Sequence, residues 1–485
     1  MKLALIYLLF AFFTVYAWRD WYKSACALVF LMAFMKWPDI PRTMFGIPGL
    51  NLWNILLVNV VGAFILARKR EGLVWDMPKA ITFMLVVYFL LIYISTFRLM
   101  NNMGPLQEFY QFLGLSAPSG TDLIKDNIIN SVRYLVPGFL IFYGCNSEQR
   151  LKLAVGAMLL LHMLLALQVI RWMPITDIAN ADALNDRGLR VLGNKVGYFK
   201  TDLAMILAGG SWMFVCSSML FTKYRLFLLG GAAICLLGMA LTGGRGGYIA
   251  WAVIGAIFAL YRWRKLIFMA PFVVLAVFAF VPAVKDRLFE GVGGEANEQQ
   301  QRRLEAVNMA GSEHDLYSIS SGRLVVWPVV IGKIGEAPFW GYGRRGFVTS
   351  GAGLYVADDL NDPTFPHPHN AYLQFTIDNG LLGAIPVFLL FFLTAKRAVR
   401  MFGAKLNAAA SAASGVGAST LFAFLTAAIS AQYFYPVESS VPLWVGIALI
   451  LRSAVELDKS ESWLKPTGTQ ELSSKEKSLK IQWDD

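Results

Sequence analysis

The sequence predicts an all-α, polytopic integral membrane protein with about 12–13 transmembrane helices. Of its 485 residues, 56% are hydrophobic and only 15% are charged, whereas a soluble domain carries about a quarter charged residues. Apolar runs of roughly 15 to 22 residues recur along nearly the whole chain, and such a run is long enough to cross a bilayer. These runs are expected to be helices, because an open strand cannot satisfy its backbone hydrogen bonds in lipid.

The apolar runs, taken in order, give the predicted spans, and one or two short ones could instead be re-entrant or interfacial. No small-residue cleavage site follows the first run, so we interpret it as a retained span rather than a signal peptide. The alanine-rich stretch 407–418 is expected to be a helix or a tight turn whose small residues allow close packing. The spans are 3–17, 22–37, 50–67, 80–97, 131–144, 151–170, 201–221, 226–242, 247–261, 266–284, 371–395, 416–433 and 440–453.

Basic residues gather in alternate short loops, which predicts that these loops are cytoplasmic. Topology therefore accounts for the net charge of +11 better than a nucleic-acid partner does. The basic groups are Arg68 to Arg70, Arg150 with Lys152, Lys223 with Arg225, Arg262 to Lys265, and Lys396 to Lys405. The intervening segments are then external, and all the distinctive polar stretches fall on that face: 38–49, 98–130, 171–200, 243–246, 285–370 and 434–439.

We expect three regions along the chain. Residues 1–200 form N-terminal transmembrane helices, residues 201–454 form a second membrane domain that includes the external loop 285–370, and the polar residues 455–485 form a disordered cytoplasmic tail. The external loop starts with a charged insertion at 290–315, where an amphipathic helix is expected near 295–310. The four cysteines have no paired spacing and lie in or beside apolar runs, so we expect buried thiols: Cys26, Cys145, Cys216 and Cys235.

Arg245 lies in the run Thr242-Gly243-Gly244-Arg245-Gly246-Gly247, between two spans with no room for a soluble loop. Glycines allow close backbone approach and expose amide groups, and a guanidinium presents a planar fork that suits phosphate oxygens. The alternative is an interfacial arginine that snorkels at a tight turn. The number of flanking glycines exceeds what a turn needs, which favours an anion site.

Arg323 and His369 lie at two ends of the second half of the external loop. Ser321-Gly322-Arg323 precedes an apolar stretch that resembles the start of a short helix, which Ser321 could cap. His369 follows a proline-restricted segment and precedes a span, so its imidazole should lie at the membrane surface. A histidine there can accept a proton from a hydroxyl nucleophile or neutralise a phosphate. A structural role, or a catalytic role for His367 instead, are the alternatives.

An acidic group and a basic group in the external segments could each bind a ligand or could simply be exposed to solvent or lipid. Asp358, Asp359 and Asp362 could hold a divalent ion, but their spacing matches no dedicated metal site and a solvated acidic loop is favoured. The basic cluster consists of Arg187, Arg190, Lys195 and Lys200. It could bind diphosphates or simply contact lipid headgroups. No metal and no other cofactor is therefore expected.

Taken together, these motifs resemble the bacterial O-antigen ligase and O-antigen polymerase superfamily, whose C-terminal domain also occurs in protein O-oligosaccharyltransferases. The resemblance covers about residues 200–450. The motifs are Thr242 to Gly247, Ser321-Gly322-Arg323 with Trp327, Pro338 to Gly343 with Phe347, and His369-Asn370 followed by Gly380-Leu381-Leu382-Gly383.

The resemblance implies a metal-independent, inverting glycosyltransferase with a fold similar to the GT-C type. It would lie in the bacterial inner membrane with its active site facing the periplasm, and would transfer a glycan from undecaprenyl diphosphate to an acceptor hydroxyl. Arg245 and Arg323 would hold the diphosphate, and His369 would activate the acceptor or assist the leaving group. The further substrate-binding candidates are Gly244, Gly246, Ser321, Asn370, Arg187 and Arg190.

The acceptor stays open at this point, with a ligase slightly favoured over a polymerase. A ligase uses the lipid A core, a polymerase uses a second lipid-linked glycan, and a protein O-oligosaccharyltransferase uses a serine or threonine of a protein. A transporter of lipid-linked glycans is the alternative from a different class. Mid-span charges are scarce and the polar signals gather on one face, which favours the enzyme.

Overall fold

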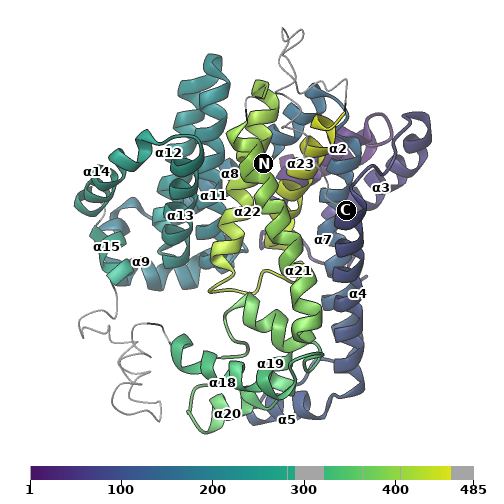
Figure 1. Cartoon of the computed structure of the whole chain (residues 1–485), viewed down its shortest axis with the longest axis vertical. Coiled ribbons are helices and arrows are strands. Elements are labelled where there is room, and N and C mark those ends of the chain that lie inside the picture. Colours follow the sequence, from purple (N-terminus) through teal and green to yellow (C-terminus); the bar gives the residue numbers. More distant parts are fainter. Residues whose placement is uncertain are drawn as a thin grey trace, which may run out of the picture.

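A computed structural model describes residues 2–47, 49–280, 282–289, 320, 322–363, 365–404 and 406–459. Within these ranges the regular elements are helices, and a helix occupies every predicted span (Figure 1). Seven helices are long and apolar enough to cross a membrane, and three shorter apolar helices accompany them. The chain is therefore an all-α polytopic membrane protein, as predicted.

The bundle is built from two runs of helices. The first run is α1 (Lys2–Tyr16), α2 (Trp21–Met35), α3 (Leu52–Arg70), α4 (Lys79–Asn101), α7 (Asn130–Gly144) and α8 (Glu148–Trp172). The second run is α11 (Lys200–Leu220), α12 (Arg225–Thr242), α13 (Arg245–Tyr261), α14 (Lys265–Phe280), α21 (Ala371–Gly403), α22 (Ala408–Ala427) and α23 (Val441–Leu457). The runs are interleaved, since α8 packs on α11 and α12 while α7 packs on α23.

Helix α22 lies at the centre and is buried along most of its length. The span predicted at 416–433 is displaced, because the helix begins at Ala408 and ends at Ala427. Its first half is too rich in alanine, glycine and serine to stand out by hydropathy. These small residues allow close packing: a Cβ on Gly417 would lie 2.8 Å from the Gly446 carbonyl oxygen. The predicted buried thiols are confirmed, as all four cysteines are free and buried.

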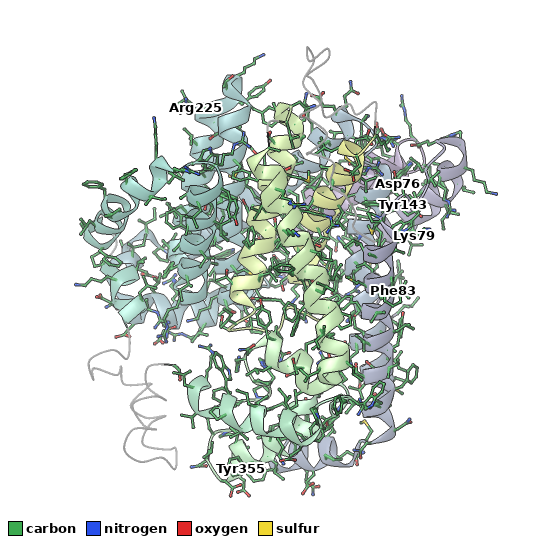
Figure 2. The ribbon with its side chains drawn as sticks, viewed as in Figure 1. Asp76, Lys79, Phe83, Tyr143, Arg225 and Tyr355 are labelled. Atoms are coloured by element: carbon green, nitrogen blue, oxygen red, sulfur yellow. The ribbon has the colours of Figure 1, made fainter. Side chains whose placement is uncertain are left out.

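Contacts between helix ends define two ends of the bundle. At the basic end, Arg150 pairs with Glu71 at 2.8 Å, Arg452 pairs with Asp76 at 2.7 Å, and Arg262 donates to the Phe402 carbonyl at 2.7 Å. At the other end, the Tyr433 hydroxyl donates to Asp202 at 2.6 Å and the Ala371 amide donates to the Ala428 carbonyl at 2.7 Å. Figure 2 shows Arg225 at the first end and Tyr355 at the second.

A polar subdomain lies beyond the second end of the bundle (Figure 1). It combines α5 (Gly104–Phe112) and α6 (Gly120–Leu123) with α18 (Arg323–Glu336), α19 (Gly346–Thr349) and α20 (Ala352–Asp358). These helices share a separate small core with the end of α4 and the start of α21, in which Phe109, Val330 and Phe347 are buried. Two segments predicted to be external, 98–130 and 285–370, thus pack on each other in their described parts. The insertion 290–315 with its expected helix lies outside the described residues.

Candidate active site

Helix α21 begins at the polar subdomain and is broken after its third turn. The Asn370 side-chain oxygen accepts hydrogen bonds from the amides of Tyr372 and Leu373, at 3.0 and 3.2 Å, and so caps the helix. Gly380 interrupts the helix with φ 65° and ψ −177°, a conformation that is essentially restricted to glycine. Asn370, a predicted substrate-binding residue, thus caps the helix and fixes the start of α21 directly after His369.

The glycine-rich aromatic turn from Pro338 to Gly343 fills this break. The amides of Leu381 and Leu382 donate to the carbonyls of Pro338 and Phe339, at 2.7 and 3.3 Å. In return, the amides of Tyr342 and Gly343 donate to the carbonyls of Ile377 and Asp378, both at 2.8 Å. The turn therefore supplies the backbone partners that the break removes. The guanidinium of Arg98 on α4 also binds this turn, donating to the carbonyls of Trp340 and Gly341 at 2.5 and 2.6 Å.

The glycines around Arg245 form a tight turn between α12 and α13. Gly243 ends α12 with φ 65°, and the Gly244 amide donates to the Thr242 hydroxyl at 3.2 Å. A Cβ on either Gly244 or Gly247 would lie 2.6 Å from the Ala204 Cβ on α11. These two glycines are thus required by helix packing, while a Cβ on Gly246 would meet only the Ser430 hydroxyl, at 3.3 Å. The packing holds the half-buried Arg245 at the first residue of α13.

Arg323 opens α18 directly after Gly322, whose φ is 83°. The Ser320 hydroxyl accepts a hydrogen bond from the Leu324 amide at 3.0 Å. Ser321, which was predicted to cap this helix, lies outside the described residues. The Arg323 Nε is buried without a hydrogen-bond partner in the described chain. Burial lowers the pKa of Arg323, and the positive charge of Arg245 lowers it further. The two guanidinium groups therefore lie within electrostatic range of each other.

His369 lies beside Arg323 at the start of α21. The Trp327 indole on α18 donates to the Pro368 carbonyl at 3.0 Å, which ties the arginine helix to the histidine segment. His369 has a left-handed backbone with φ 49°, unusual for a residue with a side chain. Burial lowers the pKa of His369 to about 4, Arg323 adds to the lowering, and Asp362 opposes it. His369 is therefore neutral at physiological pH and able to accept a proton.

His367 differs from His369 although their ring centroids are only 4.0 Å apart. The His369 amide donates to His367 Nδ1 at 3.2 Å, so Nδ1 is unprotonated and the neutral ring has its proton on Nε2. Burial lowers the pKa of His367 to about 2, and the charges of His369, Arg344 and Arg323 lower it further. His367 is thus a hydrogen-bond donor through Nε2, while His369 is the better candidate for a base.

The three loop aspartates do not share one environment. Asp358 and Asp359 are exposed, as a solvated loop requires, but Asp362 is only 4% exposed. The interpretation of a solvated acidic loop is therefore wrong for Asp362, because the chain folds back and its amide donates to the Val356 carbonyl at 3.0 Å. Its carboxylate acts electrostatically on His369 instead.

The external basic cluster lies at the end of the bundle that carries the candidate site. Two of its arginines already contact other residues of the chain. Arg187 ends α9 (Ala181–Arg187) and lies 3.8 Å from the Asp177 carboxylate, while Arg190 donates to the Asp186 carbonyl at 3.3 Å. A Cβ on Gly188, which lies between them, would be 3.0 Å from the Thr242 carbonyl oxygen. The cluster therefore borders the turn that carries Arg245.

The sequence analysis missed a polar network around Asp378, a fully buried residue of α21. Its carboxylate accepts hydrogen bonds from the Gly346 amide at 2.6 Å, Gln374 at 2.6 Å and Tyr435 at 2.7 Å, and pairs with Arg344 at 3.2 Å. The Arg344 guanidinium carbon lies 3.6 Å from the Tyr435 ring centroid. The run Gly343-Arg344-Arg345-Gly346 carries the same signal as Arg245, arginine flanked by glycine, and could have been found.

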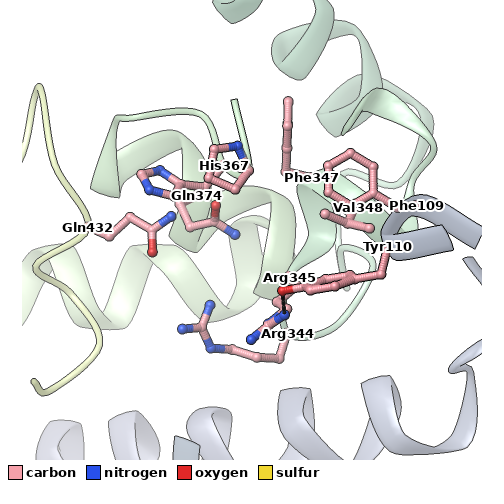
Figure 3. A pocket seen from close by; sticks show the side chains of 10 residues that line it. Phe109, Tyr110, Arg344, Arg345, Phe347, Val348, His367, Gln374 and Gln432 are labelled. Atoms are coloured by element: carbon pink, nitrogen blue, oxygen red, sulfur yellow. Dashed lines mark hydrogen bonds between the residues drawn. The ribbon is translucent and has the colours of Figure 1, made fainter. Parts of the chain in front are cut away.

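A cavity of ≈ 190 Å³ lies beside this network (Figure 3). Phe109 and Tyr110 of α5 and Phe347 of α19 supply its aromatic wall, and Arg345, His367, Gln374 and Gln432 are among its polar groups. Figure 3 shows the Arg345 guanidinium hydrogen-bonded to the Tyr110 hydroxyl, a contact of 2.7 Å. Arg245, Arg323 and His369 do not line it.

Comparison with known proteins agrees with the motifs. Residues 230–388 match the family model described as O-antigen ligase, named Wzy_C, and this range contains Arg245, Arg323 and His369. The comparison with curated proteins gives no match. The domain at residues 230–388 is thus similar to the O-antigen ligase domain, which supports the predicted relation to the O-antigen ligase and O-antigen polymerase superfamily.

Proposed function

We propose that the chain transfers a glycan from undecaprenyl diphosphate to an acceptor hydroxyl at the periplasmic face of the bacterial inner membrane, most closely in the manner of an O-antigen ligase. The observation that carries this is Arg323, a cation that has a buried Nε without a hydrogen-bond partner in the described chain and that lies near a second arginine. Arg323 and Arg245 lie half-buried within electrostatic range, and Arg323 has no carboxylate partner in the described chain. Such a pair is stabilised by binding an anion.

The placement of the three residues supports an inverting transfer. The acceptor hydroxyl gives its proton to neutral His369 while its oxygen attacks the anomeric carbon of the donor sugar. The bond between that carbon and the diphosphate oxygen breaks on the opposite side, which inverts the configuration. The developing negative charge on the diphosphate lies at Arg323 and Arg245, so the two cations stabilise the transition state without a divalent ion.

The periplasmic location rests on charge asymmetry. The clusters Arg68 to Arg70, Arg262 to Lys265 and Lys396 to Arg400 lie at the end of the bundle opposite the candidate site. Clusters of this kind favour the cytoplasmic side. The candidate site then faces the compartment where acceptors for lipid-linked glycans are exposed.

Transfer by the purified protein in EDTA tests the proposal directly. The donor is a glycan linked to undecaprenyl diphosphate, and the lipid A core, a second lipid-linked glycan and a protein are offered in parallel as acceptors. We expect product with one acceptor and no product with His369→Ala. Product that depends on added divalent ion would contradict the metal-independent mechanism, and donor binding without product on any acceptor would favour transport.

A further inference from the structure

The cavity beside the Asp378 network has the size of one sugar ring. Its volume of ≈ 190 Å³ is below the roughly 300–1,000 Å³ of pockets that hold drug-sized ligands. Phe109, Tyr110 and Phe347 give it flat apolar surfaces, and the remaining wall is largely polar (Figure 3). Aromatic faces beside planar amides suit a sugar, whose ring has an apolar C–H face and a polar edge.

Gln374 offers the cavity a buried hydrogen-bond acceptor. Its side chain is 2% exposed, and its Nε2 donates to Asp378 at 2.6 Å, which fixes the orientation of the amide. Its Oε1 is then buried with no hydrogen-bond partner in the described chain. A buried acceptor without a partner costs free energy that a ligand hydroxyl would recover.

Three other side chains of the cavity wall offer donors. His367 presents Nε2–H, because its Nδ1 already accepts the His369 amide. Arg345 binds the Tyr110 hydroxyl and has no carboxylate partner among the described residues. Gln432, on the loop after α22, makes no hydrogen bond within the described chain and can bond to a ligand in either direction.

We propose that this cavity is the acceptor subsite and that it holds the sugar ring whose hydroxyl attacks the donor. The assignment rests on the proposed glycosyl transfer. His367 lines the cavity, and its ring lies 4.0 Å from the ring of His369, the proposed base. Arg245 and Arg323 lie outside the lining, so the donor diphosphate and the acceptor sugar occupy neighbouring but separate places around His369. A sugar-bearing acceptor fits this cavity better than a serine or threonine side chain.

The test separates acceptor binding from donor binding in steady-state kinetics. The full-length protein is assayed with the acceptor that gives product in the three-acceptor experiment, varying one substrate while the other is saturating. Gln374→Leu and Gln432→Ala should each raise the acceptor KM about tenfold, as expected for one lost hydrogen bond, and leave the donor KM unchanged. Gln107→Leu is the matched control, because Gln107 is an exposed residue of α5 outside the cavity wall.

The outcomes distinguish the two proposals. A wild-type protein that forms no product contradicts the glycosyl transfer itself. A wild-type protein that transfers, with variants that raise the donor KM or leave the acceptor KM unchanged, overturns only the acceptor subsite. Transfer to a protein hydroxyl, with an acceptor KM that neither variant changes, would also overturn only the acceptor subsite. Gln432→Ala keeps the test valid if Gln374→Leu disturbs folding through Asp378, since Gln432 has no internal hydrogen bond to lose.

Discussion

Charge balance distinguishes Arg323, which we propose binds the diphosphate, from the structural arginines. Arg344 pairs with Asp378 and Arg452 pairs with Asp76, so each is neutralised within the fold. Arg323 instead has a buried Nε without a partner and a second arginine in electrostatic range. An arginine that destabilises its own surroundings is expected to serve a ligand.

Arg323→Ala should therefore lower activity without lowering stability. Loss of one group that stabilises the developing charge should reduce kcat/KM by roughly 10²–10³-fold. The melting temperature should stay the same or rise, because the repulsion from Arg245 is removed. Arg323→Lys should recover part of the activity, since it restores the charge but not the planar fork. The exposed Arg42→Ala serves as control, and a drop in melting temperature for Arg323→Ala would indicate a structural role instead.

The pH profile should report His369. Because burial and then Arg323 lower its pKa to about 4, kcat/KM should be constant across neutral pH and fall as the pH drops through about 4. Bound diphosphate adds negative charge near His369 and should raise its pKa in the substrate complex. The acid limb of kcat should therefore lie at a higher pH than the acid limb of kcat/KM. Asp362→Asn removes the charge that raises this pKa and should move the acid limb of kcat/KM to lower pH. An acid limb that does not move in Asp362→Asn would exclude His369 as the titrating base.

At the scale of elements, the break in α21 joins the polar subdomain to the bundle. The turn Pro338 to Gly343 is bonded to both sides of the break, and Arg344 donates its amide to the Ser95 carbonyl of α4 at 2.8 Å. His367 and His369 lie directly before the same helix. Two motifs that are separate in the sequence thus form one structural unit.

Gly380→Ala should destabilise the protein strongly. Alanine at φ 65° and ψ −177° is strained by about 1–3 kcal/mol. Its Cβ would also lie 2.1 Å from the Phe339 carbonyl oxygen, so the turn would have to move. Thermal unfolding in detergent should show a clear fall in melting temperature. Gly332→Ala in α18 is the matched control and should be neutral or slightly stabilising, because no atom lies within 4 Å of its added Cβ.

At the scale of the molecule, the two ends of the bundle should face different compartments. Cysteine is placed at Tyr355 or at Arg225, which are exposed at opposite ends (Figure 2). The native cysteines are buried, so the background of labelling should be low. A membrane-impermeant maleimide should label Tyr355→Cys from the periplasmic side and Arg225→Cys only after the inner membrane is opened. The reverse pattern would place the candidate site in the cytoplasm.

The sequence by itself determined the membrane class and the approximate helices. It also predicted a site at Arg245, Arg323 and His369, which stays a proposal. Hydropathy and composition act locally, so they can be read from a single chain. The span predicted at 416–433 was displaced from α22, because the small residues of this helix are selected by packing against α11 and α23 rather than by contact with lipid. The stretch 407–418 was expected to be a helix or a tight turn, and it lies in the first half of α22.

Only the tertiary structure decided which residues share an environment. It brought Arg323 within range of Arg245, buried Asp362 near His369, and built a cavity from α5, α19, α21 and the loop after α22. These relations join segments far apart in the chain, and no local pattern encodes them. The roles of the two histidines also required the fold, because a single hydrogen bond from the His369 amide decides which nitrogen of His367 carries the proton.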